Sequence, residues 1–202
     1  MRRLRGSVWC AAVCCALLLA ACSAPGSEPS SATTPIPTPD LAQLREQWGL
    51  VDCPETDPDA TPVDGGLPAT ALPCLGTEDP VNLAGLPREP WVINLWAQWC
   101  PPCRAESPIL REALASIDGV NFLGIDYNDP QPDWAIEFAG TVGWAYPQIQ
   151  DMDKTLQVPL KVAGLPTTVF VDADGTIAYI HPGELDSLDE LEDLIAEHLG
   201  GR

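Results

Sequence analysis

The sequence predicts an α/β domain whose central mixed β-sheet is flanked by helices and preceded by an N-terminal extension. Strand and helix patterns alternate from residue 91 onwards, which is typical of an α/β fold. Within residues 91–127, strand, helix and strand follow one another as in a βαβ unit with a parallel sheet. Two later strands joined by a turn add an antiparallel part, and 202 residues suit one such domain with appendages.

Residues 1–21 have the features of an export signal. The opening MRRLRG is basic, and the apolar run from Val8 to Ala21 ends in small residues. This run is too short to span a bilayer comfortably. The residues Leu19-Ala20-Ala21-Cys22 resemble the lipobox of bacterial lipoproteins, in which cleavage occurs before a cysteine that becomes lipid-modified. We therefore expect lipidation at Cys22, with an ordinary small-residue cleavage site as the alternative.

Residues 22–39 are expected to form a tether. The segment SAPGSEPSSATTPIPTP is nearly all Ser, Thr, Pro, Ala and Gly, and it offers no apolar surface to bury. A flexible chain of this length would hold the domain roughly 20 Å from the bilayer. The sequence thus predicts an extracytoplasmic lipoprotein anchored to the bacterial cell membrane.

The chain is strongly acidic, with a formal net charge of −19. Removing residues 1–21 would remove three arginines and no acid, which makes the charge more negative. Such a surface argues against nucleic-acid partners and against electrostatic docking on anionic lipid. Membrane attachment should therefore depend on the lipid anchor, and solubility is the simpler explanation of the acidity.

Four cysteines would remain in the mature chain after signal cleavage and lipidation: Cys53, Cys74, Cys100 and Cys103. An even number in an exported protein suggests two disulfides. The two-residue spacing favours Cys100 with Cys103, which leaves Cys53 with Cys74. The second pair would close a loop of about 20 residues and stabilise the fold by roughly 3 kcal/mol, with an electron relay as the alternative role.

Residues 40–71 are expected to form the N-terminal extension. Asp40 is a candidate N-cap for the helix DLAQLREQW, which has one apolar face and Gly49 as its stop. Residues 51–90 are rich in Pro, Asp, Thr and Gly and lack periodicity. They predict loops, with a short hairpin around LPCLG and PVNLAGL.

The remaining elements follow the α/β pattern. WVINLWA is a buried strand, residues 101–117 are a helix, and VNFLGIDY is a second strand. DWAIEFAGTVG has a helical apolar face, YPQIQD is short and extended, and TTVFVDADGTIAYI is two strands joined by a turn. Ser187 caps a final helix, LDELEDLIAEHL, with one apolar stripe. The expected core order is β-α-β-α-β-β-α.

The pair Cys100 and Cys103 lies where a buried strand turns into a helix. The Cys100 sulfur should sit among unpaired amides at the positive end of the helix dipole, which favours its thiolate. Pro101 and Pro102 suit the first turn and leave the amides of Cys103 and Arg104 to face the sulfur. Cys103, facing the core, should be less acidic. Disulfide exchange needs such an exposed attacker and a sheltered resolving thiol.

Other uses of this pair fit the sequence less well. A two-residue loop excludes little conformational entropy, so a purely structural staple is disfavoured. A zinc site needs further ligands, and neither a second close cysteine pair nor a histidine pair at ligand spacing is present. CPPCR also lacks the histidine of a c-type haem attachment motif. We therefore expect no metal and no cofactor.

Two motifs give the chain a family resemblance. The segment Trp96–Cys103, WAQWCPPC, together with GLPTT at residues 164–168, resembles the thioredoxin fold. It is most similar to the extracytoplasmic TlpA/ResA-like thiol-disulfide oxidoreductases. The resemblance covers roughly residues 72–199 and implies a thioredoxin-like domain over residues 72–202. It also implies an additional strand and helix near residues 127–150.

The resemblance assigns substrate-binding roles to three residues: Trp99, Leu165 and Pro166. In the family the proline of the second motif is cis and packs against the active-site sulfurs, and the preceding residue offers its backbone to the substrate. A proline presents no amide hydrogen, so an extended substrate can pair alongside like an added strand.

Glu106 is the third candidate catalytic residue. Thioredoxin has a buried aspartate six residues before its first active-site cysteine, whereas this chain has Asn94 there. The tethered branch likewise has asparagine and places a glutamate three residues after the second cysteine, which here is Glu106. Such a carboxylate could exchange a proton with the Cys103 thiol if burial raises its pKa. The alternative is a solvent-facing first-turn glutamate favoured by the helix dipole.

These observations predict a lipid-anchored thiol-disulfide oxidoreductase acting on exported protein thiols or disulfides. The resemblance implies a reductant, in cytochrome c maturation, that receives electrons from a membrane protein. The CPPC residues leave the direction open, because the reduction potential relative to the surroundings decides it. A general oxidative folding catalyst and a peptide-binding lipoprotein with an inherited disulfide are the alternatives.

Overall fold

The computed structural model describes residues 39–200 of the chain. The expected signal peptide, the lipidation candidate Cys22 and residues 22–38 of the expected tether lie outside the described residues. No helix among residues 39–200 is both long and apolar enough to cross a membrane.

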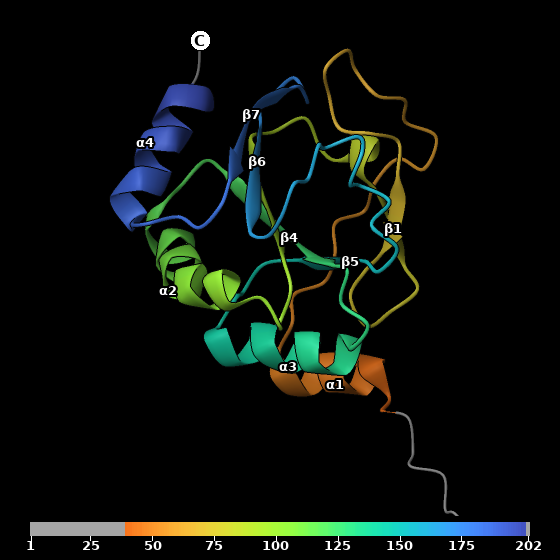
Figure 1. The fold of residues 1–202 in the computed structure, drawn as a ribbon. Coiled ribbons are helices and arrows are strands. Elements are labelled where there is room, and N and C mark those ends of the chain that lie inside the picture. Colours follow the sequence, from red (N-terminus) through yellow and green to blue (C-terminus); the bar gives the residue numbers. More distant parts are fainter. Residues whose placement is uncertain (1–38, 201–202) are drawn as a thin grey trace, which may run out of the picture. The chain divides into compact units, whose positions relative to one another are not determined.

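A mixed five-stranded sheet forms the centre of the fold (Figure 1). The strand order is β5 (Gln148–Asp151), β4 (Asn121–Tyr127), β3 (Trp91–Trp96), β6 (Thr167–Val171) and β7 (Ile177–Pro182). β3, β4 and β5 are parallel, whereas β6 pairs antiparallel with β3 and β7 pairs antiparallel with β6. The predicted mixed sheet is confirmed, with one strand more than the expected core order, because the extended segment YPQIQD contains the edge strand β5.

Three helices cover one face of the sheet: α2 (Pro101–Ser116), α3 (Pro132–Val142) and α4 (Leu188–His198). Figure 1 shows α2 and α4 on the opposite side of the sheet from the short strand β1 (Ala71–Pro73). Their apolar side chains pack on alternate strand residues, because successive residues of a strand point to opposite faces. This face of the sheet also carries buried polar side chains: Asn94, Asp126, Gln148, Gln150 and Thr168.

A second apolar cluster fills the other face of the sheet. The hairpin of β1 and β2 (Pro80–Asn82), the 3-10 helix η1 (Leu83–Gly85) and residues 156–162 cover this face. Their buried side chains meet those of the central strands, among them Ile93, Ile125 and Val169. The sheet is therefore buried on both sides, which explains the apolar runs in its parallel strands.

The N-terminal helix α1 (Leu41–Trp48) begins and ends where the sequence predicts. The Asp40 side chain accepts a hydrogen bond from the Gln43 N–H, and Gly49 ends the helix in the left-handed conformation. α1 packs on α3, where Trp48 lies against Gly140 so closely that a Cβ there would collide with the indole. Residues 39–71 thus belong to the same compact unit as the rest of the described chain.

Segments of the extension and the following hairpin pair with both edges of the sheet. Cys74 forms an antiparallel bridge with Ile149 of β5, and Gly66 forms one with Thr176 beside β7. A disulfide with an S–S distance of 2.03 Å joins Cys74 to Cys53. The extension is therefore joined to the hairpin by a disulfide and to the sheet by backbone hydrogen bonds.

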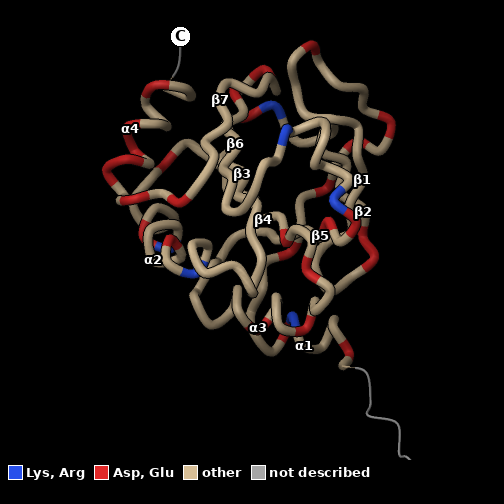
Figure 2. Tube along the Cα trace, in the orientation of Figure 1, with Lys and Arg blue, Asp and Glu red and all other residues tan. Residues whose placement is uncertain are grey.

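Acidic residues outnumber basic ones along the chain, as the colours of Figure 2 show. The helix α4 has the sequence LDELEDLIAEH, with five acidic residues and no Lys or Arg. It begins at the predicted cap, because the Ser187 side chain accepts a hydrogen bond from the Glu190 N–H. Acidic residues in its first turn also suit the positive end of the helix dipole.

Candidate active site

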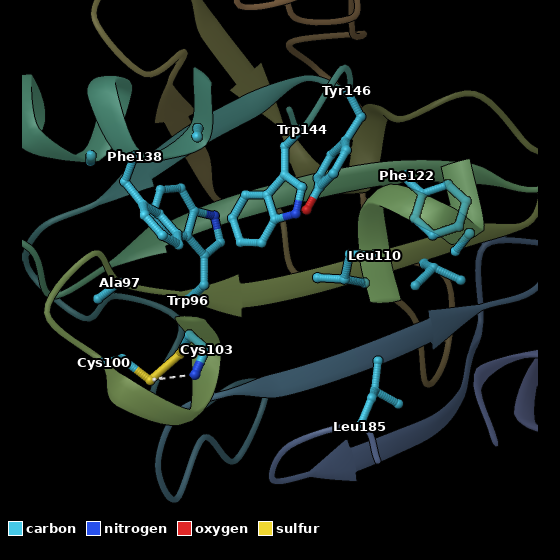
Figure 3. Close-up of a cluster of buried hydrophobic side chains, with 14 of the residues drawn as sticks. Trp96, Ala97, Cys100, Cys103, Leu110, Phe122, Phe138, Trp144, Tyr146 and Leu185 are labelled. Atoms are coloured by element: carbon cyan, nitrogen blue, oxygen red, sulfur yellow. Dashed lines mark hydrogen bonds between the residues drawn. A yellow bond between two sulfur atoms is a disulfide. The ribbon is translucent and has the colours of Figure 1, made fainter. Parts of the chain in front are cut away.

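Cys100 is the N-cap residue of α2 and forms a disulfide with Cys103. β3 ends at Trp96, and residues 97–100 carry the chain to the first helical residue, Pro101. The Cys103 N–H donates a hydrogen bond to the Cys100 Sγ at 3.2 Å, the dashed line in Figure 3. Pro101 and Pro102 occupy the first two helical positions, where missing amide hydrogens leave no intrahelical bond unmade. The helix start thus directs an amide and the positive end of its dipole toward this sulfur.

Both cysteines are buried in this disulfide form. Cys100 is 2 % exposed and Cys103 is 0 % exposed, so the expectation of an exposed Cys100 is wrong here. The turn after β3 folds inward, and both cysteines join the apolar cluster that contains Ala97 and Trp96 (Figure 3). Trp99 instead is 47 % exposed, and its Nε1–H donates to a backbone carbonyl. The exposed apolar surface beside the disulfide therefore includes Trp99.

Arg104 is placed differently from the sequence expectation. Its backbone N–H donates to the Cys100 carbonyl oxygen in a regular helical bond, not to the sulfur. Its guanidinium donates to the Gln98 carbonyl oxygen at 3.0 Å and lies over the Phe138 ring, 4.7 Å from the ring centroid. The charge is held by these two partners because a carbonyl oxygen and an aromatic face both attract a guanidinium. Arg104 therefore anchors the turn that precedes Cys100.

Glu106 lies one helical turn beyond Cys103, facing inward with no exposed surface. One carboxyl oxygen accepts a hydrogen bond from Asn94 Nδ2 at 2.9 Å, and the other accepts from the Leu185 N–H at 3.1 Å. Burial raises the pKa of Glu106 from 4.5 to about 7; the two hydrogen bonds oppose the rise and nearby Glu184 adds to it. The solvent-facing alternative is wrong. A carboxyl of this pKa can both accept and return a proton near neutral pH.

The peptide bond between Leu165 and Pro166 is cis. It immediately precedes β6, whose first residue, Thr167, pairs with Leu95 near the end of β3. Because β3 leads into the turn before Cys100, this pairing brings the two sequence motifs to the same end of the sheet. Leu165 packs against the cluster that contains both cysteines. The Pro166 carbonyl oxygen is occupied by the Gly183 N–H at 3.0 Å.

Two further carboxyls near this turn are not singled out by any sequence motif. Asp129 is fully buried and accepts hydrogen bonds from the Gln98 N–H at 3.1 Å and the Gln131 N–H at 3.0 Å. Asp126 is also fully buried, at the end of β4. The only sequence signal is their place after a buried strand, at the carboxyl edge of the parallel sheet, where α/β proteins tend to build their sites.

The second disulfide lies at the edge strand β5, away from the strand that leads to Cys100. The Cys53 Sγ is 3.2 Å from the Gln148 carbonyl oxygen, a sulfur–oxygen contact without a hydrogen because a disulfide sulfur carries none. Residues 39–200 contain no group of three or more His, Cys, Asp or Glu side chains placed to hold a metal ion.

A family model supports the assignment that the two motifs suggest. The model of the AhpC/TSA family matches residues 65–180. The chain belongs to the AhpC/TSA family. The match covers β3, β4, β5, β6 and the first part of β7, and it includes both motifs. AhpC/TSA membership thus agrees with the thioredoxin-like fold.

Similar proteins indicate the kind of thioredoxin-like protein to which the chain is related. The chain is 33 % identical over 135 residues to the thiol:disulfide interchange protein DsbE of Pseudomonas fluorescens biotype C, across 65 % of this chain and 73 % of that protein. It is 37 % identical over 98 residues to DsbE of Escherichia coli K12, across 48 % of this chain and 51 % of that protein. The chain thus spans only about half the length of this second relative.

A similar solved structure belongs to the same kind of protein as these relatives. It is a secreted disulfide oxidoreductase of Mycobacterium tuberculosis that is homologous to E. coli DsbE. The two structures share a TM-score of 0.57 and 28 % sequence identity, over 64 % of this chain and 96 % of that one. The chain is accordingly a thiol-disulfide oxidoreductase of the thioredoxin superfamily, of the extracytoplasmic DsbE/TlpA type.

Proposed function

We propose that this AhpC/TSA protein is a membrane-tethered oxidoreductase that exchanges disulfides with exported proteins through Cys100 and Cys103. The observation that carries the proposal is the disulfide at the start of α2, with the Cys103 N–H aimed at the Cys100 sulfur and the Glu106 carboxyl buried one turn further on. The amide and the helix dipole favour a thiolate on Cys100, which is the reactive form in disulfide exchange.

In the reducing direction, the Cys100 thiolate attacks one sulfur of a substrate disulfide. A mixed disulfide forms, and the other substrate sulfur leaves as a thiolate that takes up a proton. Cys103 then loses its proton to the Glu106 carboxylate and attacks the Cys100 sulfur, which releases the second substrate thiolate. The substrate gains two electrons, and the protein ends with the Cys100–Cys103 disulfide. In the oxidising direction the same steps run in reverse.

The substrate is expected to bind beside the cis-proline. Leu165 precedes Pro166 at the head of β6 and packs on the cluster that contains both cysteines. Trp99, which directly precedes Cys100, adds an exposed indole. An extended peptide could pair with the backbone of Leu165 and rest on Trp99, since strand addition provides binding with little sequence preference.

We assign the reducing direction, in cytochrome c maturation, on the strength of the resemblance to the TlpA/ResA-like proteins. The electrons would come from a membrane protein, and Cys22 would keep the domain near that donor. A reduction potential near or below that of thioredoxin, about −270 mV, is expected for this role. A potential near that of DsbA, about −120 mV, would contradict it and favour a general oxidative folding catalyst.

Trapping in cell envelopes tests the order of the thiols and the partner together. Cys103→Ser should accumulate a mixed disulfide through Cys100, whereas Cys100→Ser should trap little and turn nothing over. Mass spectrometry of the captured protein identifies the substrate. Capture of an apocytochrome c or of a protein that acts on it would support the proposed role. Capture of many unrelated secreted proteins would favour general folding, and a mixed disulfide through Cys103 would overturn the assignment of the attacker.

Insulin reduction separates an oxidoreductase from a peptide-binding lipoprotein that keeps its disulfide without using it. The wild type should catalyse the reduction in the presence of a dithiol, and the double variant with both Cys100 and Cys103 changed to serine is the matched control. Equal rates for the two proteins would favour the binding protein.

A further inference from the structure

The turn that carries Cys100 is held from the side by the segment that follows β4. The Gln98 N–H donates to Asp129 Oδ2 at 3.1 Å, and Trp99 Nε1–H donates to the Asn128 carbonyl oxygen at 3.3 Å. Asn128 adopts a left-handed conformation with φ of 55°, which few non-glycine residues do. Two hydrogen bonds thus connect residues 98 and 99 to residues 128 and 129, immediately before the attacking cysteine of the proposed reaction.

Asp129 has the hydrogen bonds of an ionised carboxylate. Its two oxygens each accept a backbone N–H, from Gln98 and from Gln131. An ionised carboxylate can only accept, so two amide donors at these distances favour its charged form. Burial raises the pKa of Asp129 above its usual value; these amide donors oppose the rise, and the nearby Asp133 adds to it. Each oxygen of the Asp129 carboxylate is therefore paired with one backbone N–H.

Asp126, the neighbouring buried carboxyl, has far fewer hydrogen-bond donors than Asp129. It faces the same side of the sheet as Trp96, its register partner on β3, and has no exposed surface. Oδ2 has one distant donor, Gln150 Nε2 at 3.5 Å, and Oδ1 has no hydrogen-bond partner. Burial and the Asp129 charge both raise the pKa of Asp126 well above its usual range. A second unpaired carboxylate here would be costly, so the burial of Asp126 and the neighbouring Asp129 both favour its neutral form.

We propose that Asp129 is a positioning residue for the active-site turn, and that a proton on the buried Asp126 is what allows Asp129 to keep its hold on Gln98. This inference rests on the proposed function in one respect: the turn it concerns carries the attacking Cys100. When Asp126 loses its proton, two like charges share one buried site. The Gln98 hydrogen bond then weakens, and the turn becomes free to move away from its place at the start of α2.

The neighbouring charges do not neutralise this pair. Asp133, in the first turn of α3, adds a third negative charge near Asp129. Arg104 lies on the other side of the turn, where its guanidinium holds the Gln98 carbonyl oxygen. From β5 the neighbour is the uncharged Gln150, and from β3 it is Trp96. The backbone of Gln98 is thus held by a cation at its carbonyl oxygen and by the Asp129 carboxyl at its N–H.

Hydrogen exchange at the Gln98 amide tests the proposal without any turnover. The full-length oxidised protein, in detergent micelles, would be studied by NMR between pH 5 and pH 9, with each rate divided by its intrinsic rate. We expect wild-type protection at Gln98 to fall at least tenfold across this range. Asp126→Asn, which cannot ionise, should lose less than threefold. Glu137→Gln, an exposed charge removal on α3, should behave as wild type.

Asp129→Asn should lose protection at Gln98 at least tenfold already at pH 5, because an amide presents only one acceptor oxygen to two N–H donors. If this variant fails to fold, the comparison of wild type with Asp126→Asn still decides the question. Constant wild-type protection across the range, or an equal fall in Asp126→Asn, would overturn the proposal. Because no substrate is involved, these results stand whether or not the protein reduces disulfides.

A chemical readout separates positioning from general stability. In the reduced protein, the pH dependence of Cys100 alkylation by iodoacetamide reports the thiolate at the start of α2. Asp126→Asn should keep the wild-type rate near pH 6 and exceed it at least twofold near pH 9, after correction for the thiolate fraction. Identical profiles for wild type, Asp126→Asn and Glu137→Gln would show that the carboxyl pair does not position the turn.

Discussion

The carboxyl of Glu106 has no exposed surface, and its two oxygens accept hydrogen bonds from Asn94 and from the backbone of Leu185. Its pKa is raised from 4.5 to about 7, so the folded protein favours the neutral form. Well below pH 4.5 the carboxyl is protonated in both the folded and the unfolded chain, so its ionisation does not change stability there. As pH rises from 4.5 to 7, the unfolded state loses its proton first, and the fold loses about 3 kcal/mol of stability.

Glu106→Gln should reverse the sign of its effect between acid and alkaline pH. At pH 8 it removes the buried charge, so the free energy of unfolding should rise by about 2 kcal/mol after the loss of the Leu185 hydrogen bond. At pH 4 only that loss remains, and stability should fall by about 1 kcal/mol. Urea denaturation at the two pH values measures both. Glu112→Gln, an exposed change on the same helix, is the control, and a Glu106→Gln effect of one sign at both pH values would contradict the prediction.

Single residues differ in how far the sequence predicts them. Cys100 and Cys103 follow from spacing and from their place before a helix, because local chemistry sets their role. The burial of Cys100 could not be read in this way, since it depends on how the turn packs against Trp96 and Ala97. The role of Asp129 could not be predicted from the sequence either, because it depends on a contact with Gln98, 31 residues earlier.

At the scale of elements, short sequence signals predict where helices begin. Asp40 and Ser187 cap α1 and α4 as the sequence predicts, because a cap acts within three residues of its own position. The strand β5 is harder to predict from the sequence, since QIQD is polar for a buried strand. The Gln148 side chain explains its burial: it accepts a hydrogen bond from Trp96 Nε1 at 2.9 Å and lies directly over Gly124, where a Cβ would overlap with it.

The Cys53–Cys74 disulfide is expected to stabilise the fold without taking part in electron transfer. It joins positions 21 residues apart and ties the extension to the bridge with β5. Replacing both cysteines with serine should lower the free energy of unfolding by about 3 kcal/mol, since the unfolded chain regains loop entropy. Insulin reduction at low temperature should stay within about threefold of wild type.

Denaturation curves and turnover of the same samples measure the two effects of this double change. Abolished turnover in a serine variant that is still folded would show that the Cys53–Cys74 pair belongs to the electron path. A single Cys53→Ser variant is less suitable, because it would leave Cys74 as a free thiol able to exchange with the active-site pair.

For the whole molecule, the acidic surface and the expected anchor make a joint prediction about membranes. Since the formal net charge of −19 gives no attraction to anionic lipid, attachment should depend on acylation at Cys22. Cys22→Ser should therefore release the protein into the soluble fraction or block its processing, while insulin reduction by the released protein is unchanged. Membrane fractionation measures this. Tight association of the Cys22→Ser protein at high salt would contradict it and would indicate another anchor.

The bridges at both edges of the sheet have a consequence for how crowded copies of the protein behave. An uncovered edge strand offers free N–H and C=O groups to any other extended chain, which is a common start of aggregation. Here the Leu75 N–H donates to Gln148 on β5, and the Ile177 N–H of β7 donates to Gly65. At these positions the edge strands already have backbone partners, so under the proposed function a substrate chain would pair at the cis-proline rather than there.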